Sequence, residues 1–491
     1  MATTNHEMFE RARLARDARF DGRFFIGVKT TGIYCRPICP ANSPRPENVS
    51  FFPTAAAAAE AGYRPCLRCR PETAPGTPAW GGTSTTVLRG LRLISNGALD
   101  EGSIEGLSDR LGVSSRHLRR LFTEHLGASP QAIAHTQRLH FAKRLLDETR
   151  LPMSQVAEAA GYGSVRRFND AFLNSYGRAP RELRRIGAQE EAANPAAPMS
   201  VTLAYRQPFD WPALLRYFAA RGTPGVETVD GNVYRRSFGL ADCSGVIAIE
   251  PDRKLPRLRL TFLGITTANL YAAVQRVREM LDLDAPIEDI AQVLERDPVL
   301  LPRLEALPGV RVPGAWDGFE LAVRTILGQQ VSVAGATTVT GRIAEAWGQP
   351  LPAAAVPVAA GLTRIFPSAQ ALSSAPLERV GIIASRANAI RSMAAAVVNG
   401  TLSFDCAQDP ERFASALTSI KGIGEWTAQY LCMRVLKHPD AFPASDLGLR
   451  KAIEPGARVS PGELNSRAEH WRPWRAYAAM LLWQGPQPSG G

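Results

Sequence analysis

Apolar residues follow two different spacings along this chain, and the change falls near residue 285. Apolar and polar positions alternate in the runs VTLAYR, VYRRSF, GVIAIE and RLRLTFL, which predicts β-strands between residues 201 and 263, with a tight turn at Asp230-Gly231. The next run, ANLYAAVQRVREML, and most of the chain from Pro286 onward have helical spacing interrupted by Pro and Gly. We therefore expect a small α+β piece followed by a larger all-α piece.

Two segments have neither spacing and are rich in small, polar or proline residues. They are PETAPGTPAWGGTSTT at 71–86 and GAQEEAANPAAPMS at 187–200, and both predict linkers. A chain of 491 residues suffices for about three domains of roughly 150 residues each. The linkers and the change of spacing predict a multidomain, mainly α protein, divided at 1–75, 85–187, 200–284 and 285–486. The run PLPAAAVPVAAG at 350–361 predicts a surface loop.

Composition narrows the class of protein. The hydrophobic content of 45% is ordinary for a globular chain. No uninterrupted apolar run reaches about 18 residues, so we expect no membrane span and no membrane partner. The N-terminus has no apolar core ahead of a cleavage site, which favours a cytoplasmic location. In that reducing compartment the seven cysteines are expected to be unpaired or metal-bound, with Cys243, Cys406 and Cys432 as buried apolar residues.

The positive charge is concentrated in the first part of the chain. The whole chain has a net charge of +11, and residues 1–187 account for +10 of it. A basic excess confined to one part is typical of a module that binds a polyanion such as DNA. The alternative is that these charges only maintain solubility.

Four of the cysteines lie in two close pairs. Cys35 and Cys39 form C-x3-C, and Cys66 and Cys69 form C-x2-C after 26 intervening residues. Two such pairs suit a tetrahedral Zn²⁺ ion, and the alternative is four cysteines of an apolar core. Arginines surround both pairs, namely Arg36, Arg45, Arg64, Arg68 and Arg70. The centre could therefore be structural, or it could hold a reactive thiolate near phosphate.

The segments TTGIYCRPICP and ENVSFFPTAAAAAEAGYRPCLRCRPE resemble the N-terminal domain of the Ada family of adaptive-response proteins. The resemblance covers about residues 4–72 and implies one Zn²⁺ ion held by all four cysteines in a small α+β domain. It also implies that Cys35 takes a methyl group irreversibly from a DNA methylphosphotriester. Methylation would make the centre less negative by one unit and could raise its affinity for DNA.

Residues 103–180 contain a helix-turn-helix pattern twice, at SIEGLSDRLGVSSRHLRRLFTEHLGASPQAI and at MSQVAEAAGYGSVRRFNDAFLNSYGRAP. Gly112 and Gly161 fall in the two turns, and Ser114 or Ser115 can cap the second helix of the first unit. The second helices carry Arg116, Arg119 and Arg120, and Arg166 and Arg167, which can contact bases or phosphates from the major groove. The doubled unit resembles the AraC-type DNA-binding domain over about residues 87–185. The alternative is an ordinary helical bundle with surface arginines.

The run LTSIKGIGEWTAQYL predicts a tight turn at Gly422 and Gly424, followed by a helix from Trp426. Backbone N–H groups in such a hairpin can bind a phosphate without base specificity, and Lys421 is placed to face it. Asp446 follows some twenty residues later in FPASDLGLRKAI. This combination resembles the helix-hairpin-helix DNA glycosylase superfamily. Taken alone, Asp446 could instead be a helix N-cap.

Within that superfamily, four fragments spanning nearly all of 200–484 resemble the AlkA family of alkyl-base glycosylases. They are VTLAYRQPFDWPALLRYFAARGTPGVETV, GAWDGFELAVRTILGQQVSVAGA, IKGIGEWTAQYLCMR and AEHWRPWRAYAAMLLW. The resemblance implies a small TBP-like α+β domain before the all-α glycosylase domain. It also implies that Asp446 is catalytic, that Trp483, Tyr430 and Trp426 line a base pocket, and that Gln330 wedges into the DNA, where AlkA has an apolar residue. For Trp471 and Trp474 we favour core packing.

The chemistry expected from this resemblance follows from charge. Alkylation at N3 or N7 makes a purine cationic, so a flipped base can stack on electron-rich rings while Asp446 stabilises the sugar cation or orients water. Bifunctional relatives carry a Schiff-base lysine at the position that Trp426 occupies, which favours monofunctional hydrolysis here. The chain has no Pro-Cys-His-Arg run, so the resemblance does not extend to repair of guanine O6.

The sequence therefore predicts a monomeric, nucleoid-associated fusion of an alkylation sensor with a DNA-3-methyladenine glycosylase. Its expected partners are double-stranded and alkylated DNA, with RNA polymerase as a further partner if the fusion activates transcription. One alternative is a methylation-activated transcription regulator whose glycosylase-like part only binds DNA. Another is a purely structural zinc protein.

Overall fold

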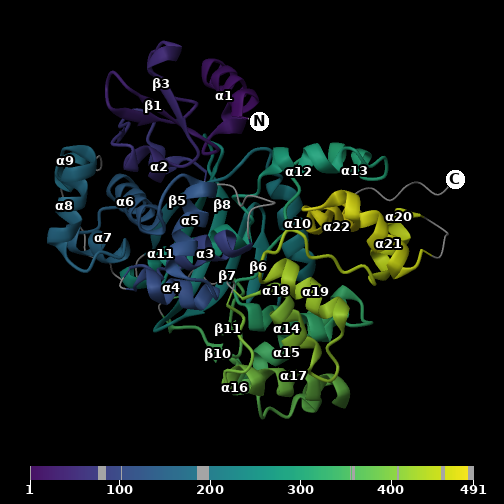
Figure 1. Cartoon of the computed structure of the whole chain (residues 1–491). Coiled ribbons are helices and arrows are strands. Elements are labelled where there is room, and N and C mark those ends of the chain that lie inside the picture. Colours follow the sequence, from purple (N-terminus) through teal and green to yellow (C-terminus); the bar gives the residue numbers. More distant parts are fainter. Residues whose placement is uncertain are drawn as a thin grey trace.

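The computed structural model describes residues 2–75, 85–100, 102–184, 198–353, 355, 360–405, 408–454 and 459–484, with side chains from His6 onward. Most of both predicted linkers, part of the predicted loop at 350–361, and Cys406 lie outside the described residues. Figure 1 shows the N-terminal part in purple, a group of blue helices beside it, a teal sheet near the centre, and green to yellow helices on the opposite side from the blue ones.

The four-cysteine part is a small sheet with short helices. Its strands have the order β3-β1-β2-β4, in which β1 is antiparallel to β2 and β3, and β2 is parallel to β4. The elements are α1 (Ala2–Ala15), η1 (Ala18–Phe20), β1 (Phe25–Val28), β2 (Ile33–Cys35), η2 (Pro46–Asn48), β3 (Val49–Phe52), α2 (Ala55–Glu60), β4 (Arg64–Pro65) and η3 (Pro71–Thr73). This confirms the expected α+β unit.

The two helix-turn-helix units are also present, joined by one long helix. The elements are α3 (Thr85–Ser95), α4 (Ile104–Leu111), α5 (Ser115–Leu126), α6 (Pro130–Glu148), α7 (Met153–Ala159), α8 (Val165–Tyr176) and α9 (Pro180–Leu183). Gly112 and Gly161 adopt left-handed φ angles of 72° and 73° in the two turns, a conformation that glycine tolerates without strain. Ser114, rather than Ser115, caps α5, and Ser164 caps α8.

The next part is a five-stranded antiparallel sheet of order β5-β9-β8-β7-β6. Its elements are β5 (Met199–Ala204), α10 (Trp211–Arg221), β6 (Glu227–Asp230), β7 (Val233–Leu240), β8 (Cys243–Pro251), β9 (Arg257–Leu263) and α11 (Thr267–Met280). The four predicted strands and the predicted helix are confirmed. The edge strand β6 and the helix α10 were not predicted.

The remaining part is almost entirely helical, as expected. Its elements are α12 (Ile287–Leu294), α13 (Leu301–Ala306), α14 (Gly318–Leu327), α15 (Val333–Trp347), β10 (Gln349–Pro350), β11 (Arg364–Ile365), α16 (Ala369–Leu372), η5 (Leu377–Val380), α17 (Ala384–Val398), α18 (Pro410–Thr418), α19 (Glu425–Arg434), α20 (Leu447–Ile453), α21 (Pro461–Ala468), η6 (Glu469–Trp471) and α22 (Arg475–Gln484). Within the described residues, no helix combines the length and the apolarity needed to cross a bilayer.

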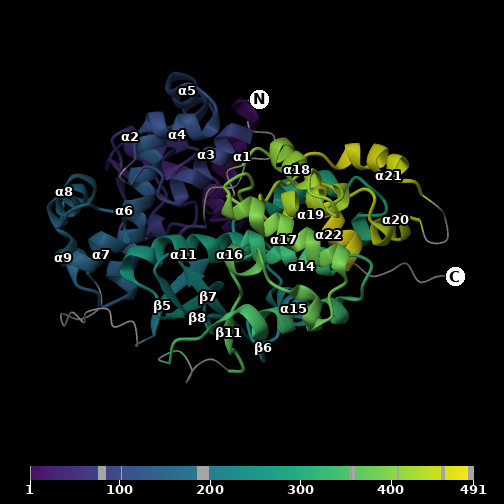
Figure 2. The same cartoon turned by 90° about the horizontal axis from the view of Figure 1, so that it is seen from below.

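The parts pack directly on one another. Helix α7 lies alongside α11 (Figure 2). One apolar cluster runs from the second helix-turn-helix unit through the sheet to α22. The N-terminal part is held by Arg23, whose guanidinium pairs with Glu288 and Asp289 at 2.6 Å each. These contacts bring segments more than 200 residues apart into one assembly.

Candidate functional site

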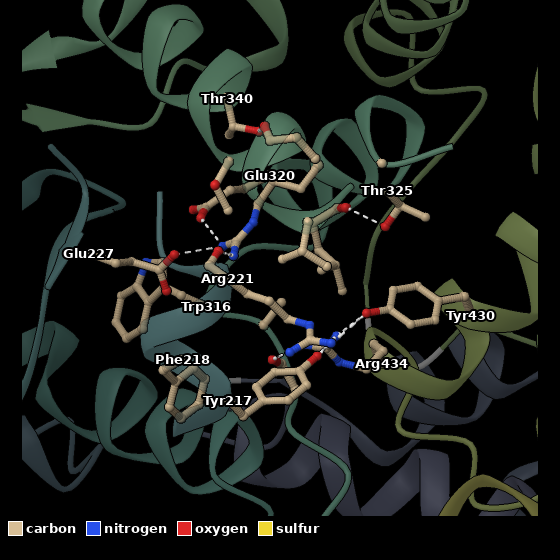
Figure 3. A pocket seen from close by; sticks show the side chains of 18 of the residues that line it. Tyr217, Phe218, Arg221, Glu227, Trp316, Glu320, Thr325, Thr340, Tyr430 and Arg434 are labelled. Atoms are coloured by element: carbon tan, nitrogen blue, oxygen red, sulfur yellow. Dashed lines mark hydrogen bonds and ion pairs between the residues drawn. The ribbon is translucent and has the colours of Figure 1, made fainter. Parts of the chain in front are cut away.

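A cleft of about 370 Å³ lies between α10, α14, α15, α19 and α22. Charged and aromatic side chains from both the sheet part and the helical part line it (Figure 3). Of the residues predicted for glycosylase chemistry, the structure brings Asp446, Trp426, Tyr430 and Trp483 together here.

Asp446 lies in this cleft and also caps a helix. Its Oδ1 accepts hydrogen bonds from the backbone N–H of Leu449, at 2.8 Å, and from Nε1 of Trp483, at 3.0 Å. Its Oδ2 accepts a hydrogen bond of 2.8 Å from Nε1 of Trp426. The N-cap alternative is therefore correct as geometry, yet it does not exclude a role in the cleft, because one carboxylate makes both sets of contacts.

The aromatic side chains of the cleft form one stacked pair and one edge-to-face pair. Trp426 and Tyr430, one turn apart on α19, stack with ring centroids 5.3 Å apart and planes at 11°. Trp483, from α22, meets Tyr430 edge-on at 6.0 Å and 64°. Trp471 and Trp474, in contrast, are buried at 0% and 3% exposure and lie away from the cleft lining, which confirms the expectation that they pack in the core.

A buried arginine lies below these rings. Arg434 donates to the hydroxyls of Tyr430 and Tyr217, as Figure 3 shows, and to the carbonyls of Pro313 and Gly314. Burial, the largest single cause, raises the pKa of the Tyr430 phenol, but the charge of Arg434, the hydrogen bond with Tyr217 and the charges of Arg221 and Arg324 together leave that pKa below its usual value. Sequence reasoning missed Arg434, although it stands four residues after Tyr430 on the same face of a helix.

The far wall of the cleft is a network of buried ion pairs that the sequence did not indicate. Arg236 pairs with Glu320 at 2.7 Å, and Arg324 pairs with Glu227 at 2.7 Å and with Glu320 at 3.1 Å. Because β6, β7 and α14 supply these charges, the network fixes the sheet against the helical part. Buried charges that are fully paired are far less costly than isolated ones.

The glycine hairpin lies close to the predicted wedge position. Gly422 has a φ angle of 96°, Gly424 is the N-cap of α19, and both are exposed, as is Lys421. Nε2 of Gln329 donates to the carbonyl oxygen of Gly422 at 3.2 Å and so ties the hairpin to the turn after α14. In that turn Gln330 is exposed with a left-handed φ of 54°, and the neighbouring Val331 lines the cleft.

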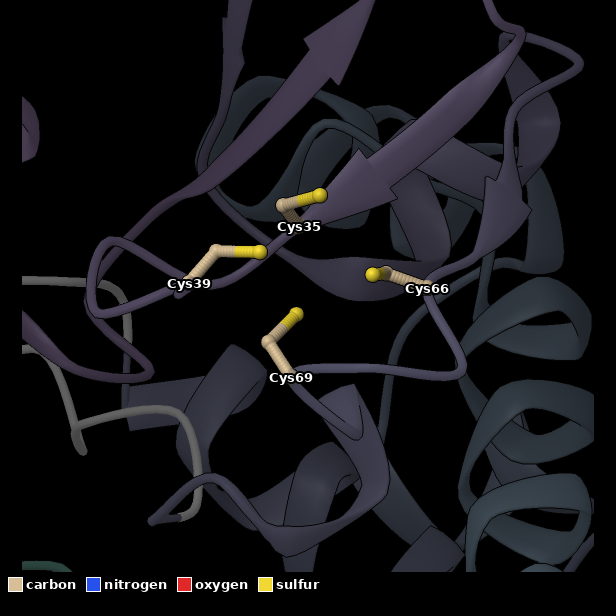
Figure 4. A group of neighbouring side chains, drawn as sticks. All are labelled: Cys35, Cys39, Cys66 and Cys69. Atoms are coloured by element: carbon tan, nitrogen blue, oxygen red, sulfur yellow. The ribbon is translucent and has the colours of Figure 1, made fainter. Parts of the chain in front are cut away.

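The four cysteines converge in the N-terminal part (Figure 4). Cys35 ends β2, Cys66 follows β4, and the four sulfur atoms lie within 4.8 Å of one another. Cys66 and Cys69 are buried, while Cys35 and Cys39 are half-buried.

Four thiols this close cannot all ionise without a cation between them. Mutual hydrogen bonding raises the pKa of Cys35, with Cys39 as the largest cause, and lowers that of Cys39 to about 7, with Cys35 as the largest cause. A bound Zn²⁺ ion removes this conflict, since it takes four sulfur ligands as thiolates at about 2.3 Å. The donor set therefore fits the metal.

The predicted recognition helices present their arginines to solvent. Arg116, Arg119 and Arg120 on α5 are exposed, and so are Arg166 and Arg167 on α8. Figures 1 and 2 both place these helices away from α19 and α20, so the structure does not bring these arginines to the cleft.

Comparison with known proteins identifies each part. The model of the metal binding domain of Ada matches residues 9–72, and a helix-turn-helix domain matches 107–186. The AlkA N-terminal domain matches 200–317, and the HhH-GPD superfamily of base excision DNA repair proteins matches 323–475. A probable bifunctional transcriptional activator/DNA repair enzyme AlkA of Mycobacterium tuberculosis is 39% identical over 484 residues, which cover 97% of this chain and 96% of that protein. The chain belongs to this bifunctional AlkA family.

Relatives of the two halves agree with the family. The DNA-3-methyladenine glycosylase 2 of Escherichia coli is 32% identical over 292 residues, covering 58% of this chain and 98% of that enzyme. The bifunctional transcriptional activator/DNA repair enzyme Ada of the same organism is 41% identical over 119 residues, covering 24% of this chain and 32% of that protein. A solved 3-methyladenine DNA-glycosylase from Archaeoglobus fulgidus shares the fold, with a TM-score of 0.50 at 22% identity over 57% of this chain and 97% of its own.

These findings establish the general properties of this AlkA-family chain. It is a DNA repair protein and DNA glycosylase with a DNA-binding helix-turn-helix part. Its four cysteines bind one Zn²⁺ ion. The predicted combination of an Ada-like zinc-binding part, a helix-turn-helix part and an AlkA-like glycosylase part in one chain is confirmed.

Proposed function

We propose that this protein releases alkylated purines of the 3-methyladenine type from DNA by monofunctional hydrolysis of the N-glycosidic bond. We also propose that Cys35 takes a methyl group from a DNA methylphosphotriester, and that this change regulates transcription. The observation that carries the first part is Asp446, held by two indole N–H groups at the wall of an aromatic cleft.

The cleft suits a flipped, positively charged base. Glycosylases extrude their target base from the duplex, and each aromatic face can contribute about 0.5–2 kcal/mol of cation–π attraction to a cationic base. Trp426, Tyr430 and Trp483 supply such faces. Arg434 donates to the Tyr430 hydroxyl and so fixes the orientation of this ring in the cleft.

Asp446 acts where positive charge develops. As the bond between the sugar and the base breaks, its electron pair goes to the base and leaves an oxocarbenium-like sugar. A fixed carboxylate stabilises that cation or orients the water that adds to it. The glycine hairpin holds the phosphate backbone beside the lesion through Lys421, Gly422 and Gly424. Either Gln330 or the neighbouring exposed Val331 enters the gap left by the base.

The methyl transfer needs an accessible sulfur. Zinc, when bound, keeps the cysteines as thiolates at neutral pH. The Cys35 sulfur attacks the methyl carbon, an S–C bond forms, the O–C bond breaks, and the electron pair leaves with the phosphate oxygen. Cys35 is half-buried and so more accessible to DNA than the buried Cys66 and Cys69. Cys39 is half-buried as well, so a test of the acceptor substitutes Cys35 and Cys39 separately.

The remaining expectations rest on the same proposal. The recognition helices would bind an operator through Arg116, Arg119, Arg120, Arg166 and Arg167, and an activator of this kind contacts RNA polymerase. We expect a cytoplasmic, nucleoid-associated monomer, with domain boundaries at 1–75, 85–187, 200–284 and 285–486.

One experiment separates repair from regulation alone. The purified protein is incubated with duplexes that each carry one alkylated base, and released bases are identified by chromatography. The proposal expects free 3-methyladenine and an intact abasic strand. If every duplex is bound and none loses its base, the glycosylase-like part only binds DNA, and the regulator alternative is correct.

A further inference from the structure

A second hollow, of about 410 Å³, opens beside the zinc-binding cysteines. The N-terminal part contributes Cys35, Cys39, Arg64 and Arg68 to its wall. The second helix-turn-helix unit contributes Tyr176, the last residue of α8, and Arg178, two residues after it. The environment of the acceptor sulfur is therefore built from two parts of the chain.

Close packing fixes α8 against this hollow. Gly177 ends the helix with a φ angle of 67°, and a Cβ atom at that position would lie only 3.3 Å from Nη1 of Arg64. Tyr176, at 6% exposure, stacks on Phe172 at 5.3 Å, and Leu67 packs against the same apolar cluster. Arg178 is thereby placed within the cysteine site by the fold, not by a flexible arm.

Ion pairs also connect the cysteine part to α6, the long helix that joins the two helix-turn-helix units. Arg70, one residue after Cys69, pairs with Asp147 of α6 at 2.5 Å. Lys143 of α6 pairs with the same carboxylate at 2.6 Å and lies 3.8 Å from Glu72. All four side chains are largely buried, so these pairs fix the cysteine part against α6.

The arginines of the hollow fall into two groups. Arg36 pairs with Asp21, and Arg13 pairs with Glu10, so both are neutralised. Arg64, Arg68 and Arg178 are exposed, and no acidic side chain among the described residues pairs with any of them. Three positive charges without an acidic partner among the described residues therefore line the hollow that also contains Cys35 and Cys39.

This arrangement matches the charges of the substrate. A methylphosphotriester is neutral, while the phosphodiesters on either side of it are anionic. The zinc–thiolate centre is negative and repels those neighbours, so cations at the rim are needed to bring the backbone close.

Helix α8 is long enough to cross the major groove of DNA. Its 12 residues span about 18 Å at about 1.5 Å per residue, against a major groove about 12 Å wide. If Arg166 and Arg167 at its N-terminus enter the groove, the other end reaches the bordering backbone.

We propose that Arg178 is a positioning residue for methyl transfer, which binds a phosphodiester next to the triester and so places the methyl group at Cys35. This inference rests on the proposed methyl transfer. It makes the second helix-turn-helix unit part of the acceptor site, so that one backbone segment is held by the sensor and by a recognition helix at once.

The test uses the full-length zinc protein and its Arg178→Ala, Arg178→Lys and Arg181→Ala variants. Arg181, in α9, is exposed and lies outside the hollow, so it controls for the loss of one charge. Methyl uptake from a duplex with one methylphosphotriester is followed by intact-protein mass, at limiting and at saturating DNA. Affinity for unmethylated duplex is measured as a function of salt, and zinc content is determined for each variant.

We expect Arg178→Ala to slow uptake about tenfold at limiting DNA, with little change at saturation, since about this much is lost with one charged hydrogen bond. The salt slope should fall by about 0.9, the value for one phosphate contact. Arg178→Lys should restore most of the uptake rate and most of the salt slope. Arg181→Ala should match the parent in both measurements.

Each other outcome has a definite meaning. If Arg178→Ala behaves like Arg181→Ala, the inference is wrong. A loss that lysine does not restore, with an unchanged salt slope, also overturns it, because packing would then be the cause. If the parent itself gains no methyl group, the proposed transfer fails, and the salt slope still decides whether Arg178 binds phosphate.

Discussion

Nε1 of Trp483 donates a 3.0 Å hydrogen bond to the same Asp446 oxygen that caps α20 through the N–H of Leu449. One oxygen thus couples a helix terminus to the wall of the cleft. With Trp426 on the second oxygen, both oxygens of the carboxylate accept hydrogen bonds, so its direction in the cleft is fixed before any DNA binds. Such preorganisation is how enzymes stabilise a developing charge without reorganisation.

Replacing Asp446 by asparagine should separate catalysis from folding. Asparagine caps helices about as well as aspartate, but its amide nitrogen cannot accept the hydrogen bond from Trp426, so the melting temperature should fall only slightly. Removal of the negative charge should lower 3-methyladenine release at least 100-fold, roughly the loss seen when one preorganised electrostatic group is removed. Single-turnover excision and a gel-shift assay measure the two properties.

The matched control for that variant is Asp210→Asn. Asp210 caps α10 by accepting from the N–H of Ala213 at 2.8 Å and does not line the cleft. The Asp210→Asn variant should release 3-methyladenine at the parental rate. Excision that survives in Asp446→Asn would show that another group is catalytic.

Trp483 should influence which bases are released. Trp483→Ala removes both an aromatic face and a donor to Asp446, while Trp483→Phe removes only the donor. The alanine variant should lose about 2- to 30-fold more activity on cationic 7-methylguanine than on a neutral purine, the range that corresponds to one cation–π contact. The phenylalanine variant should keep the preference at a lower overall rate. Equal losses on both bases would contradict cation–π selection.

The sequence predicted what depends on local pattern. Strands β5, β7, β8 and β9 alternate clearly, and Gly112 and Gly161 mark the two turns, so these elements were predicted correctly. The edge strand β6 was missed because ETVD carries little alternation. Its position is fixed by distant partners instead, since the buried Glu227 pairs with Arg324 from α14.

The residues of the candidate site divide in the same way into those that a local pattern predicts and those that only tertiary packing places. Asp446, Trp426, Tyr430 and Trp483 were predicted from motifs, and the structure brings them together. Arg434 below the rings carries no signal beyond helical spacing from Tyr430. The contribution of Arg178 to the cysteine hollow depends on packing of α8 against β4, which no pattern within either segment encodes.

Removal of zinc should affect one activity and spare the other. The cysteine part depends on the metal for its fold, since structural zinc sites supply folding free energy directly. The cleft is lined by residues from Tyr217 to Gln484, so base excision should persist after chelation while methyl uptake is lost. Added zinc should restore uptake. Hydrogen exchange should show loss of protection at 2–75 in Cys69→Ser but not in Cys243→Ser, a buried cysteine outside the cluster.

Borohydride should not trap the protein on DNA. The chain has six lysines, and Trp426 holds the position where a Schiff-base lysine would stand. Among the described residues that line the cleft there is no lysine, and Lys421 lies exposed on the hairpin. We therefore expect abasic product without strand cleavage and no covalent adduct on a denaturing gel. An adduct that disappears in Lys421→Arg would instead establish lyase chemistry.

Acid should weaken the contact between the cysteine part and α6 through His140. Nε2 of His140 lies 2.9 Å from the Tyr34 hydroxyl, and loss of hydration on burial lowers the pKa of His140 from about 6.5 to about 3. The unfolded chain then takes up a proton as pH falls below about 6.5, while the folded protein does not until about 3. The stabilising contribution is thus complete above pH 6.5 and declines as pH falls, by at most about 1.4 kcal/mol per unit.

His140→Gln keeps a polar group beside Tyr34 but removes this titration. Between pH 7 and pH 5.5, the parent should lose roughly 1 kcal/mol more unfolding free energy than the variant, as judged from urea midpoints with zinc content monitored at each pH. His470→Gln, at an exposed histidine, should follow the parent curve. If the parent and His140→Gln lose stability in parallel, His140 takes up its proton at the same pH in the folded and the unfolded protein, and the lowered pKa is contradicted.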